Sequence, residues 1–276
     1  IISSVDELRQ EYSAGHELLG VAVGAPGPLD YRTGIIYEAP NLKWKMIPLG
    51  KMLQEVLKVP IWVDNDANLA ALGEYTYGYP LQFESLLYLT VSTGIGGGII
   101  INGDIYHGVD SGAGEFGHMT IVPRGPRCGC GNYGCLEALA SGTAVARVAR
   151  EEVSQGRCAA LREAAGGSYE AIDARLVSAV AADGDPETGR IMQEAINYLG
   201  IGVANLVSVF NPQAIVIGGG LSGHVGLLER VEEIVKERTF ARLSENLKIL
   251  PARLGNRAGL IGCLALAERM IEELDT

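Results

Sequence analysis

The segment Cys128-Gly-Cys130-Gly-Asn-Tyr-Gly-Cys135-Leu-Glu137 follows closely after Gly114-Glu-Phe-Gly-His118. Three thiols in a C-x-C-x4-C spacing, with an imidazole upstream, supply the four ligands of a closed structural zinc site. The glycines between them let a short loop fold around one ion. Small-loop disulfides or inert cysteines are the alternative, but a third thiol would then stay unpaired. We therefore predict that Zn²⁺ is bound by His118, Cys128, Cys130 and Cys135.

Two carboxylates, Glu115 and Glu137, flank this predicted metal site. A closed zinc site needs no ligand beyond its four. Both carboxylates therefore remain free to bind another polar ligand.

The composition indicates the number of domains and argues against several classes of binding partner. The chain has 276 residues, of which 47% are hydrophobic, so its length and apolar content favour two domains with sizeable cores. A formal net charge of −11 argues against a nucleic-acid or anionic-membrane partner, because those need a positive patch. We see no stretch with the length of a membrane span and no secretory leader, which predicts a cytoplasmic protein.

Apolar runs that end in polar or glycine-rich loops alternate with helical patterns. The predicted strands cover residues 18–25, 34–37, 59–63, 86–91, 99–101, 214–217 and 248–251. The predicted helices cover residues 1–15, 48–57, 69–77, 136–154, 159–163, 172–182, 186–210, 227–237 and 258–274. This alternation predicts α/β layers, in which ligands bind at the carboxyl ends of the strands.

A cluster of acids and amides, Asp64-Asn65-Asp66-Ala67-Asn68, follows the second buried strand and begins a helix. Helix capping requires only one such side chain, and Asp64 or Asn65 would serve. A purely capping role is the alternative to a functional one. The additional carboxylate makes Asp66 our candidate for a general base.

Three loops are further candidates for ligand contacts. Residues 92–98 form a glycine-rich hairpin turn whose amides and Thr93 hydroxyl suit phosphate, although no helix follows as in a Walker loop. Gly218, Gly219 and Gly220 follow a strand and allow a flat base or ribose to approach the backbone. Asn41 lies in a turn after Pro40. Each of these loops also has a simple structural explanation as a turn.

The motifs Asp64-Asn-Asp-Ala-Asn68, Thr90-Val-Ser-Thr-Gly-Ile-Gly-Gly-Gly98, Gly114-Glu-Phe-Gly-His118 and Cys128 to Glu137, taken together, resemble the ROK family of sugar kinases and repressors. The resemblance runs from about Leu18 to Ala267. It implies an actin-like ATPase (ribonuclease H-like) fold of two α/β domains with a cleft between them. The small domain would comprise residues 1–85 plus 258–276, and the large domain, with the zinc loop, residues 86–257.

The resemblance also implies roles for individual residues. Asp66 would accept the proton of a hexose hydroxyl as that hydroxyl attacks the γ-phosphate of ATP, with Mg²⁺ bridging the phosphates. The sugar would be bound by Gly27, Asn65, Asp66, Glu115, His118 and Glu137. Thr93 and Gly94 would face the phosphate, and residues 218–220 the adenosine. His118 would both bind zinc and help to order the two glutamates, so the metal would shape the sugar pocket.

Several alternatives stay open at this stage. Residues 197–262 look most like the bacterial glucokinase branch, so glucose with transfer to its 6-hydroxyl is favoured over fructose and N-acetylmannosamine. A sugar-sensing repressor is a further alternative, which an intact Asp66 disfavours. Family members begin with an Asp-Gly-Gly-Thr hairpin that this sequence does not show, and a chain truly without it would phosphorylate poorly. The resemblance also implies a homodimer or homotetramer.

Overall fold

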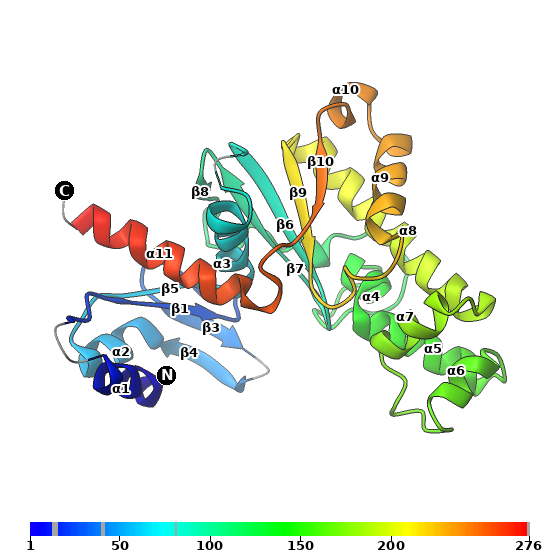
Figure 1. The fold of residues 1–276 in the computed structure, drawn as a ribbon, viewed down its shortest axis with the longest axis horizontal. Coiled ribbons are helices and arrows are strands. Elements are labelled where there is room, and N and C mark those ends of the chain that lie inside the picture. Colours follow the sequence, from blue (N-terminus) through cyan, green and yellow to red (C-terminus); the bar gives the residue numbers. More distant parts are fainter. Residues whose placement is uncertain (13–15, 40–41, 81, 275–276) are drawn as a thin grey trace.

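The computed structural model describes the chain except residues 13–15, 40–41, 81 and 275–276, so the predicted turn with Pro40 and Asn41 lies outside the described residues. The molecule is elongated, with a smaller lobe at the N-terminal end and a larger helical lobe at the other (Figure 1). The strands in the described residues form three sheets, with orders β1-β5, β2-β3-β4 and β10-β9-β6-β7-β8. Helices surround the five-stranded sheet, which confirms the α/β class.

The N-terminal lobe contains the first two of these sheets. Its elements are α1 (Ile2–Glu11), β1 (Val21–Ala25), β2 (Leu29–Asp30), β3 (Ile35–Ala39), β4 (Trp44–Pro48), α2 (Leu49–Leu57) and β5 (Ile61–Asn65). Strands β1 and β5 are parallel, and Ala25 is the partner of Asn65. The loop with Gly27 and the helix that begins after Asn65 therefore leave the sheet at the same edge.

The five-stranded sheet separates two hydrophobic cores. Its strands are β6 (Ser85–Val91), β7 (Ile95–Ile101), β8 (Asp104–Ile105), β9 (Ala214–Gly218) and β10 (Lys248–Pro251). Leu87 and Leu89 of β6 belong to the larger core, whereas Leu86 and Tyr88 face the smaller one. This period of two is that of a sheet covered on both faces.

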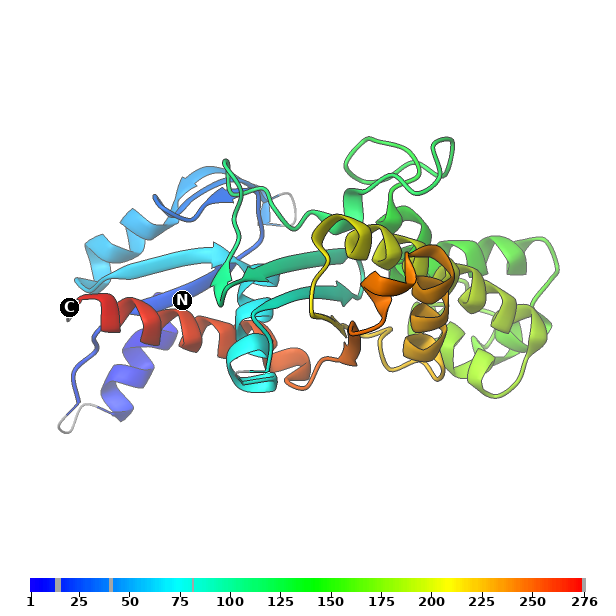
Figure 2. The ribbon, with the colours of Figure 1, turned by 90° about the horizontal axis from the view of Figure 1, so that it is seen from above.

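Helices cover both faces of this sheet, as Figure 2 shows from above. The smaller core is covered by α3 (Asp66–Gly73), the π-helix Glu74–Gly78 and α11 (Ala258–Leu274). The larger core includes α4 (Leu136–Ala140), α5 (Gly142–Ser154), α6 (Ala159–Ala164), α7 (Ala174–Ala182), α8 (Pro186–Phe210) and α9 (Leu227–Arg238). The short helix α10 (Ala241–Ser244) lies near its edge. Helix α11 also packs against α3 and β1, so it links the two lobes.

Several element predictions were wrong in detail: the predicted helix 69–77 begins at Asp66 and becomes a π-helix after Gly73, the predicted strand 18–25 begins at Val21, and two further differences have a structural explanation. Gly96 to Gly98 lie within β7 rather than in a turn, and a Cβ at Gly98 would be 2.7 Å from the Cβ of Ala71 in α3. Glycine therefore lets α3 pack directly on β7. The predicted helix 136–154 is broken at Ser141, whose hydroxyl accepts a hydrogen bond from the amide of Ala144 and caps α5.

A buried carboxylate, that of Glu74, joins the π-helix to the loop before α11. Its side chain is fully buried and accepts hydrogen bonds from the amides of Arg253 at 3.0 Å and Leu254 at 2.8 Å. This loop continues into residues 255–259, several of which line the central cleft. Glu74 therefore fixes the backbone that enters the cleft wall.

We predict that Glu74→Ala lowers the free energy of unfolding by about 3 kcal/mol, because it removes a buried carboxylate that accepts hydrogen bonds from two partly buried amides. Denaturant unfolding measures this loss. Glu55→Ala is the matched control, since the Glu55 side chain is 66% exposed, and it should change stability by less than about 0.5 kcal/mol. Equal stabilities of the two variants would contradict the structural role that we give the Glu74 carboxylate.

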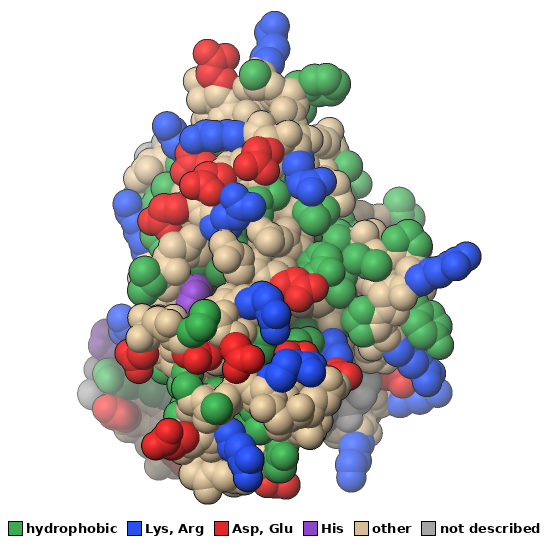
Figure 3. All heavy atoms as spheres, turned by 90° about the vertical axis from the view of Figure 1, so that its right-hand side faces the viewer, with side chains coloured by type: hydrophobic (Ala, Val, Ile, Leu, Met, Phe, Trp, Pro, Cys, Tyr) green, Lys and Arg blue, Asp and Glu red, His purple; other side chains and the backbone are tan. Residues whose placement is uncertain are grey.

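The surface is mixed in charge on the side that Figure 3 presents, where Lys and Arg alternate with Asp and Glu. Such interspersed charges do not form the continuous basic stripe that binding to phosphate backbones requires. Among the described helices, none has both the length and the apolar character needed to cross a bilayer.

Candidate active site

A cleft of about 550 Å³ lies where β5, β6 and β7 meet the segment 111–118. Ten of the residues predicted from the sequence line it, namely Gly27, Asn65, Asp66, Thr93, Gly94, Glu115, His118, Glu137, Gly219 and Gly220. Gly218 is not among the lining residues, because it is buried at the end of β9 against Tyr88. The cleft therefore brings together four motifs that are far apart in the sequence.

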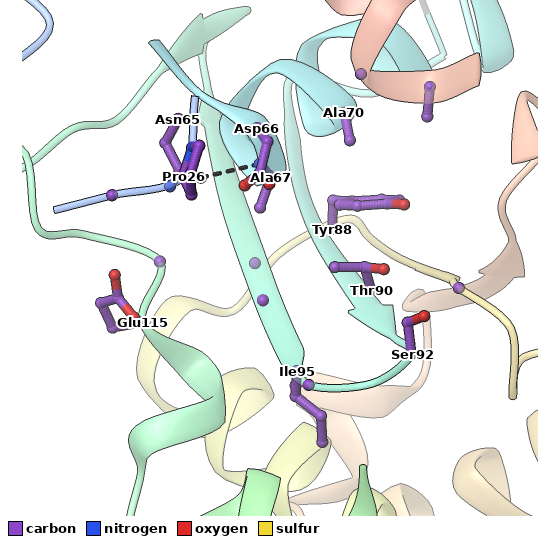
Figure 4. A pocket seen from close by; sticks show the side chains of 18 of the residues that line it. Pro26, Asn65, Asp66, Ala67, Ala70, Tyr88, Thr90, Ser92, Ile95 and Glu115 are labelled. Carbon is purple, nitrogen blue, oxygen red and sulfur yellow. Dashed lines mark hydrogen bonds between the residues drawn. The ribbon is translucent and has the colours of Figure 1, made fainter. Parts of the chain in front are cut away.

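Asn65 and Asp66 enter the cleft from the start of α3 (Figure 4). The Oδ1 atom of Asn65 accepts hydrogen bonds from the amides of Ala67 at 2.9 Å and Asn68 at 3.3 Å. Asn65 is thus the N-cap of α3. With the cap supplied by its neighbour, the Asp66 carboxylate is available to a ligand.

The Asp66 carboxyl group is exposed to the cleft but surrounded by its walls. Desolvation raises the pKa of Asp66, and its hydrogen bond with the amide of Ala67 offsets this only in part. A raised pKa strengthens a carboxylate as a proton acceptor. The site therefore has a candidate base in a defined place.

Glu137 and Glu115 approach the cleft from the opposite side to α3. The Oε2 atom of Glu137 accepts a hydrogen bond from the amide of Ile95 at 3.0 Å. It lies so close to Gly94 that a Cβ there would be 2.5 Å away. The glycine therefore allows the β6–β7 turn to lie directly against Glu137. Figure 4 shows the Glu115 side chain on the segment that faces α3.

Beside the cleft, His118, Cys128, Cys130 and Cys135 converge, with one ligand atom of each within 4.8 Å of the others. The Cys130 and Cys135 sulfurs are 3.7 Å apart, and the Cys128 sulfur is 3.6 Å from Nδ1 of His118. Tetrahedral zinc with Zn–S bonds of about 2.3 Å requires sulfurs about 3.8 Å apart, so the four residues fit this ion. All five cysteines are free thiols, so the disulfide alternative does not hold.

The second ring nitrogen of His118 lies near a carboxylate of the cleft. Nε2 of His118 lies 3.8 Å from a carboxylate oxygen of Glu115. The Cys128 sulfur is also 3.7 Å from Oε1 of Glu137. A metal at this site would therefore orient both glutamates through its own ligands.

The sequence analysis missed several residues of this site. Tyr88 and Thr90 line the cleft from β6 and Ser92 lines it from the turn that follows, whereas Asn256 and Gly259 line it from the start of α11 and the residues just before it. Polar side chains at alternate positions toward the carboxyl end of β6 were the available signal for the first three. The residues near α11 carry no motif that would have identified them.

A second cavity, of about 430 Å³, adjoins the cleft and shares Ser92, Thr93 and Gly220 with it. It extends along α5 and the N-terminal end of α7, where Thr143, Arg150, Asp173 and Arg175 line it. The cleft and this cavity together form an elongated space with the β6–β7 turn at its middle. Such a space accommodates one small polar ligand on each side of that turn.

Comparison with known proteins identifies the family to which this chain belongs. Residues 1–270 match the ROK family. The chain belongs to the ROK family. It is 39% identical over 266 residues to a glucokinase of Halalkalibacterium halodurans, covering 93% of this chain and 79% of that protein.

Two further proteins represent the repressors and the kinases found in the comparison. The chain is 38% identical over 254 residues to a xylose repressor of Caldicellulosiruptor bescii, covering 90% of this chain but only 62% of the repressor. The crystal structure of a ROK family glucokinase from Streptomyces griseus in complex with glucose and AMPPNP has a TM-score of 0.78 and 34% identity. That alignment covers 98% of this chain and 88% of the glucokinase.

Proposed function

We propose that this ROK chain is an ATP-dependent hexose kinase, with glucose as the favoured substrate and its 6-hydroxyl as the acceptor. The observation that carries the proposal is the Asp66 carboxylate at the start of α3. It lies in a cleft that also contains Glu115, Glu137 and the Thr93-Gly94 turn, which packs directly against Glu137. Similarity to glucokinases over nearly the whole chain supports the same activity.

In this proposal the hexose lies between α3 and the zinc loop. Its hydroxyls are bound by Gly27, Asn65, Asp66, Glu115, His118 and Glu137. The 6-hydroxyl oxygen attacks the γ-phosphorus, the bond to the bridging oxygen breaks to release ADP, and Asp66 accepts the hydroxyl proton. Catalysis then consists of positioning the acceptor and accepting its proton.

The nucleotide is placed on the other side of the β6–β7 turn. Thr93 and Gly94 would face the transferred phosphate, with the amides of Gly219 and Gly220 near the rest of ATP. The adjoining cavity has room for the nucleoside between α5 and α7. Gly218 does not line the cleft. Its role would be structural, because the lack of a side chain allows the end of β9 to pack closely against Tyr88 and Ala252.

Two metal ions belong to the proposal. Zn²⁺ held by His118 and the three cysteines would fix the positions of Glu115 and Glu137, without taking part in the chemistry. Mg²⁺ would arrive with ATP and neutralise phosphate charge. Among the described residues, the carboxylates that line the cleft are Asp66, Glu115 and Glu137.

The proposal also covers the wider organisation. We place the domain boundaries at residues 1–85 plus 258–276 and at 86–257, because α11 returns from β10 to pack beside β1. We further propose a homodimer or homotetramer, which sedimentation would test. A kinase that consumes ATP in the first step of hexose metabolism would act in the cytoplasm.

A sugar-sensing repressor is the second candidate, and similarity to the xylose repressor favours it. Both proteins would bind a sugar in this cleft, but only a kinase needs a proton acceptor beside the phosphate-binding turn. Asp66 in that position supports the kinase. Kinases for fructose or N-acetylmannosamine remain alternatives within the same proposal. Hexoses that differ in the orientation of a single hydroxyl group are distinguished by the detailed geometry of the pocket, which no sequence motif records.

A coupled ADP-release assay on the full-length protein tests the proposal. The panel is glucose, fructose, mannose and N-acetylmannosamine, with xylose as the control because it lacks the hydroxymethyl group of glucose. We expect turnover with glucose above the other hexoses and no ADP release with xylose. Binding of these sugars without any ADP release would favour the sensor instead.

A further inference from the structure

A partly buried histidine outside the cleft, His107, joins the two sides of the site. It follows β8, and its Nε2 lies 2.7 Å from Oδ2 of Asp64 in β5. The His107 side chain is 13% exposed and that of Asp64 is 3% exposed. The ring of Tyr31, from the turn after β2, stacks on the imidazole at 3.6 Å between centroids and 8° between planes. Neither ring lines the cleft described above.

On one side, this contact fixes the junction between β5 and α3. The second oxygen of Asp64 accepts hydrogen bonds from the amide of Asn65 at 2.7 Å and from Nδ2 of Asn68 at 3.1 Å. All of these bonds converge on the backbone that carries Asn65 and Asp66. The position of Asp64 therefore determines where those two side chains enter the cleft.

On the other side, His107 begins the loop that leads to Glu115. Its carbonyl oxygen accepts a hydrogen bond from the amide of Ala113 at 3.0 Å, which closes the loop 107–113. Gly114 then packs on Gly97 of β7, so closely that a Cβ would be 2.6 Å from the Gly97 oxygen. The chain from His107 to Glu115 is thus anchored at its start by Asp64 and at its end by β7.

We propose that His107 is a positioning residue. It holds the segment that carries Glu115 and the β5–α3 junction that carries Asn65 and Asp66 at a fixed separation across the hexose site. The inference rests on the proposed function for the identity of the ligand. Tyr31 fixes the plane of the imidazole, and the guanidinium of Arg32 lies 5.0 Å from the centre of the Tyr31 ring. An error of about 1 Å in such a separation is enough to lower a reaction rate about a hundredfold.

His107→Phe tests the proposal, because phenylalanine keeps an aromatic ring for the stack and loses the hydrogen bond to Asp64. We expect the KM for the hexose to rise about 10- to 100-fold and kcat to fall, with the KM for ATP within about twofold of the wild type. His107→Gln retains a nitrogen donor near the position of Nε2 and should restore the hexose KM to within about threefold. Tyr106→Phe, an exposed neighbour, is the control for substitution in this loop.

Hexose binding measured by calorimetry separates this proposal from that of the kinase, since it needs no turnover. Weaker hexose binding by His107→Phe, rescued by His107→Gln, would support the positioning role even in a protein without kinase activity. Unchanged hexose affinity in His107→Phe, or equal losses for ATP and hexose, would overturn it. If His107→Phe fails to fold, His107→Asn, whose shorter side chain does not reach Asp64, removes the same hydrogen bond, and an unchanged hexose KM in that variant would overturn the proposal as well.

Discussion

Asp66→Asn is expected to lower kcat for hexose phosphorylation by about a thousandfold, with hexose affinity changed less than about fivefold. A positioned general base contributes roughly 10²- to 10⁴-fold, and the amide keeps the size and polarity of the side chain without accepting the proton. Steady-state kinetics and calorimetric hexose binding measure the two quantities. Asp104→Asn is the matched control, because the Asp104 side chain is 86% exposed and lies outside the cleft lining.

The same variant separates a catalytic role from a structural one through its stability. Burial raises the pKa of Asp66, so the folded protein holds that proton more tightly than the unfolded chain does. The ionised carboxylate is therefore destabilising at neutral pH, and this cost is relieved as the pH falls through the raised pKa. Asp66→Asn should unfold at the same temperature as the wild type or higher at pH 7. A large fall in that temperature, in parallel with activity, would mean that the variant is inactive because it is misfolded.

The wild-type enzyme should also lose kcat/KM as the pH falls through this raised pKa, because a protonated Asp66 accepts no proton.

Cys135→Ser is expected to remove the metal and weaken hexose binding about 10- to 100-fold. Cys135 is fully buried and immediately precedes α4, whose first turn carries Glu137. Loss of one of four ligands frees the zinc loop, and the two glutamates lose the framework that orients them. Zinc content per chain and hexose affinity are the measurements.

Cys158→Ala is the control for this variant, because Cys158 is also fully buried but lies outside the metal cluster. It should keep its zinc and its hexose affinity, whatever its cost in stability. Full zinc content in Cys135→Ser, or lost zinc with normal hexose affinity, would contradict the role that we give the metal.

Much of the fold was predictable, because its core strands and long helices follow simple hydrophobic periodicity. The predicted helix 186–210 matches α8 (Pro186–Phe210), and its Gly200 and Gly202 pack against Ile234 and Leu136. The prediction failed where packing decides the structure. Glycines that suggested a turn lie in β7, where Gly96 and Gly98 pack against α3, and a serine cap divides α4 from α5 within a continuous helical pattern.

The candidate site was predictable where residues of one short motif share one task. The metal cluster needs only a single loop and an upstream histidine, so its spacing was informative. The contact between His107 and Asp64 joins residues 43 positions apart. Each of them alone is an ordinary polar residue at the end of a strand. Only the pairing of β1 with β5 and the course of the chain after β8 place them together.

Formation of glucose 6-phosphate from glucose and ATP is the measurement that tests the central proposal most directly. The full-length protein is incubated with both substrates, and the product is detected with a dehydrogenase specific for glucose 6-phosphate. The proposal predicts one equivalent of glucose 6-phosphate for each ADP released, and a loss of both in Asp66→Asn. Saturable glucose binding with neither product formed would contradict it and would leave the sugar sensor as the better description of this chain.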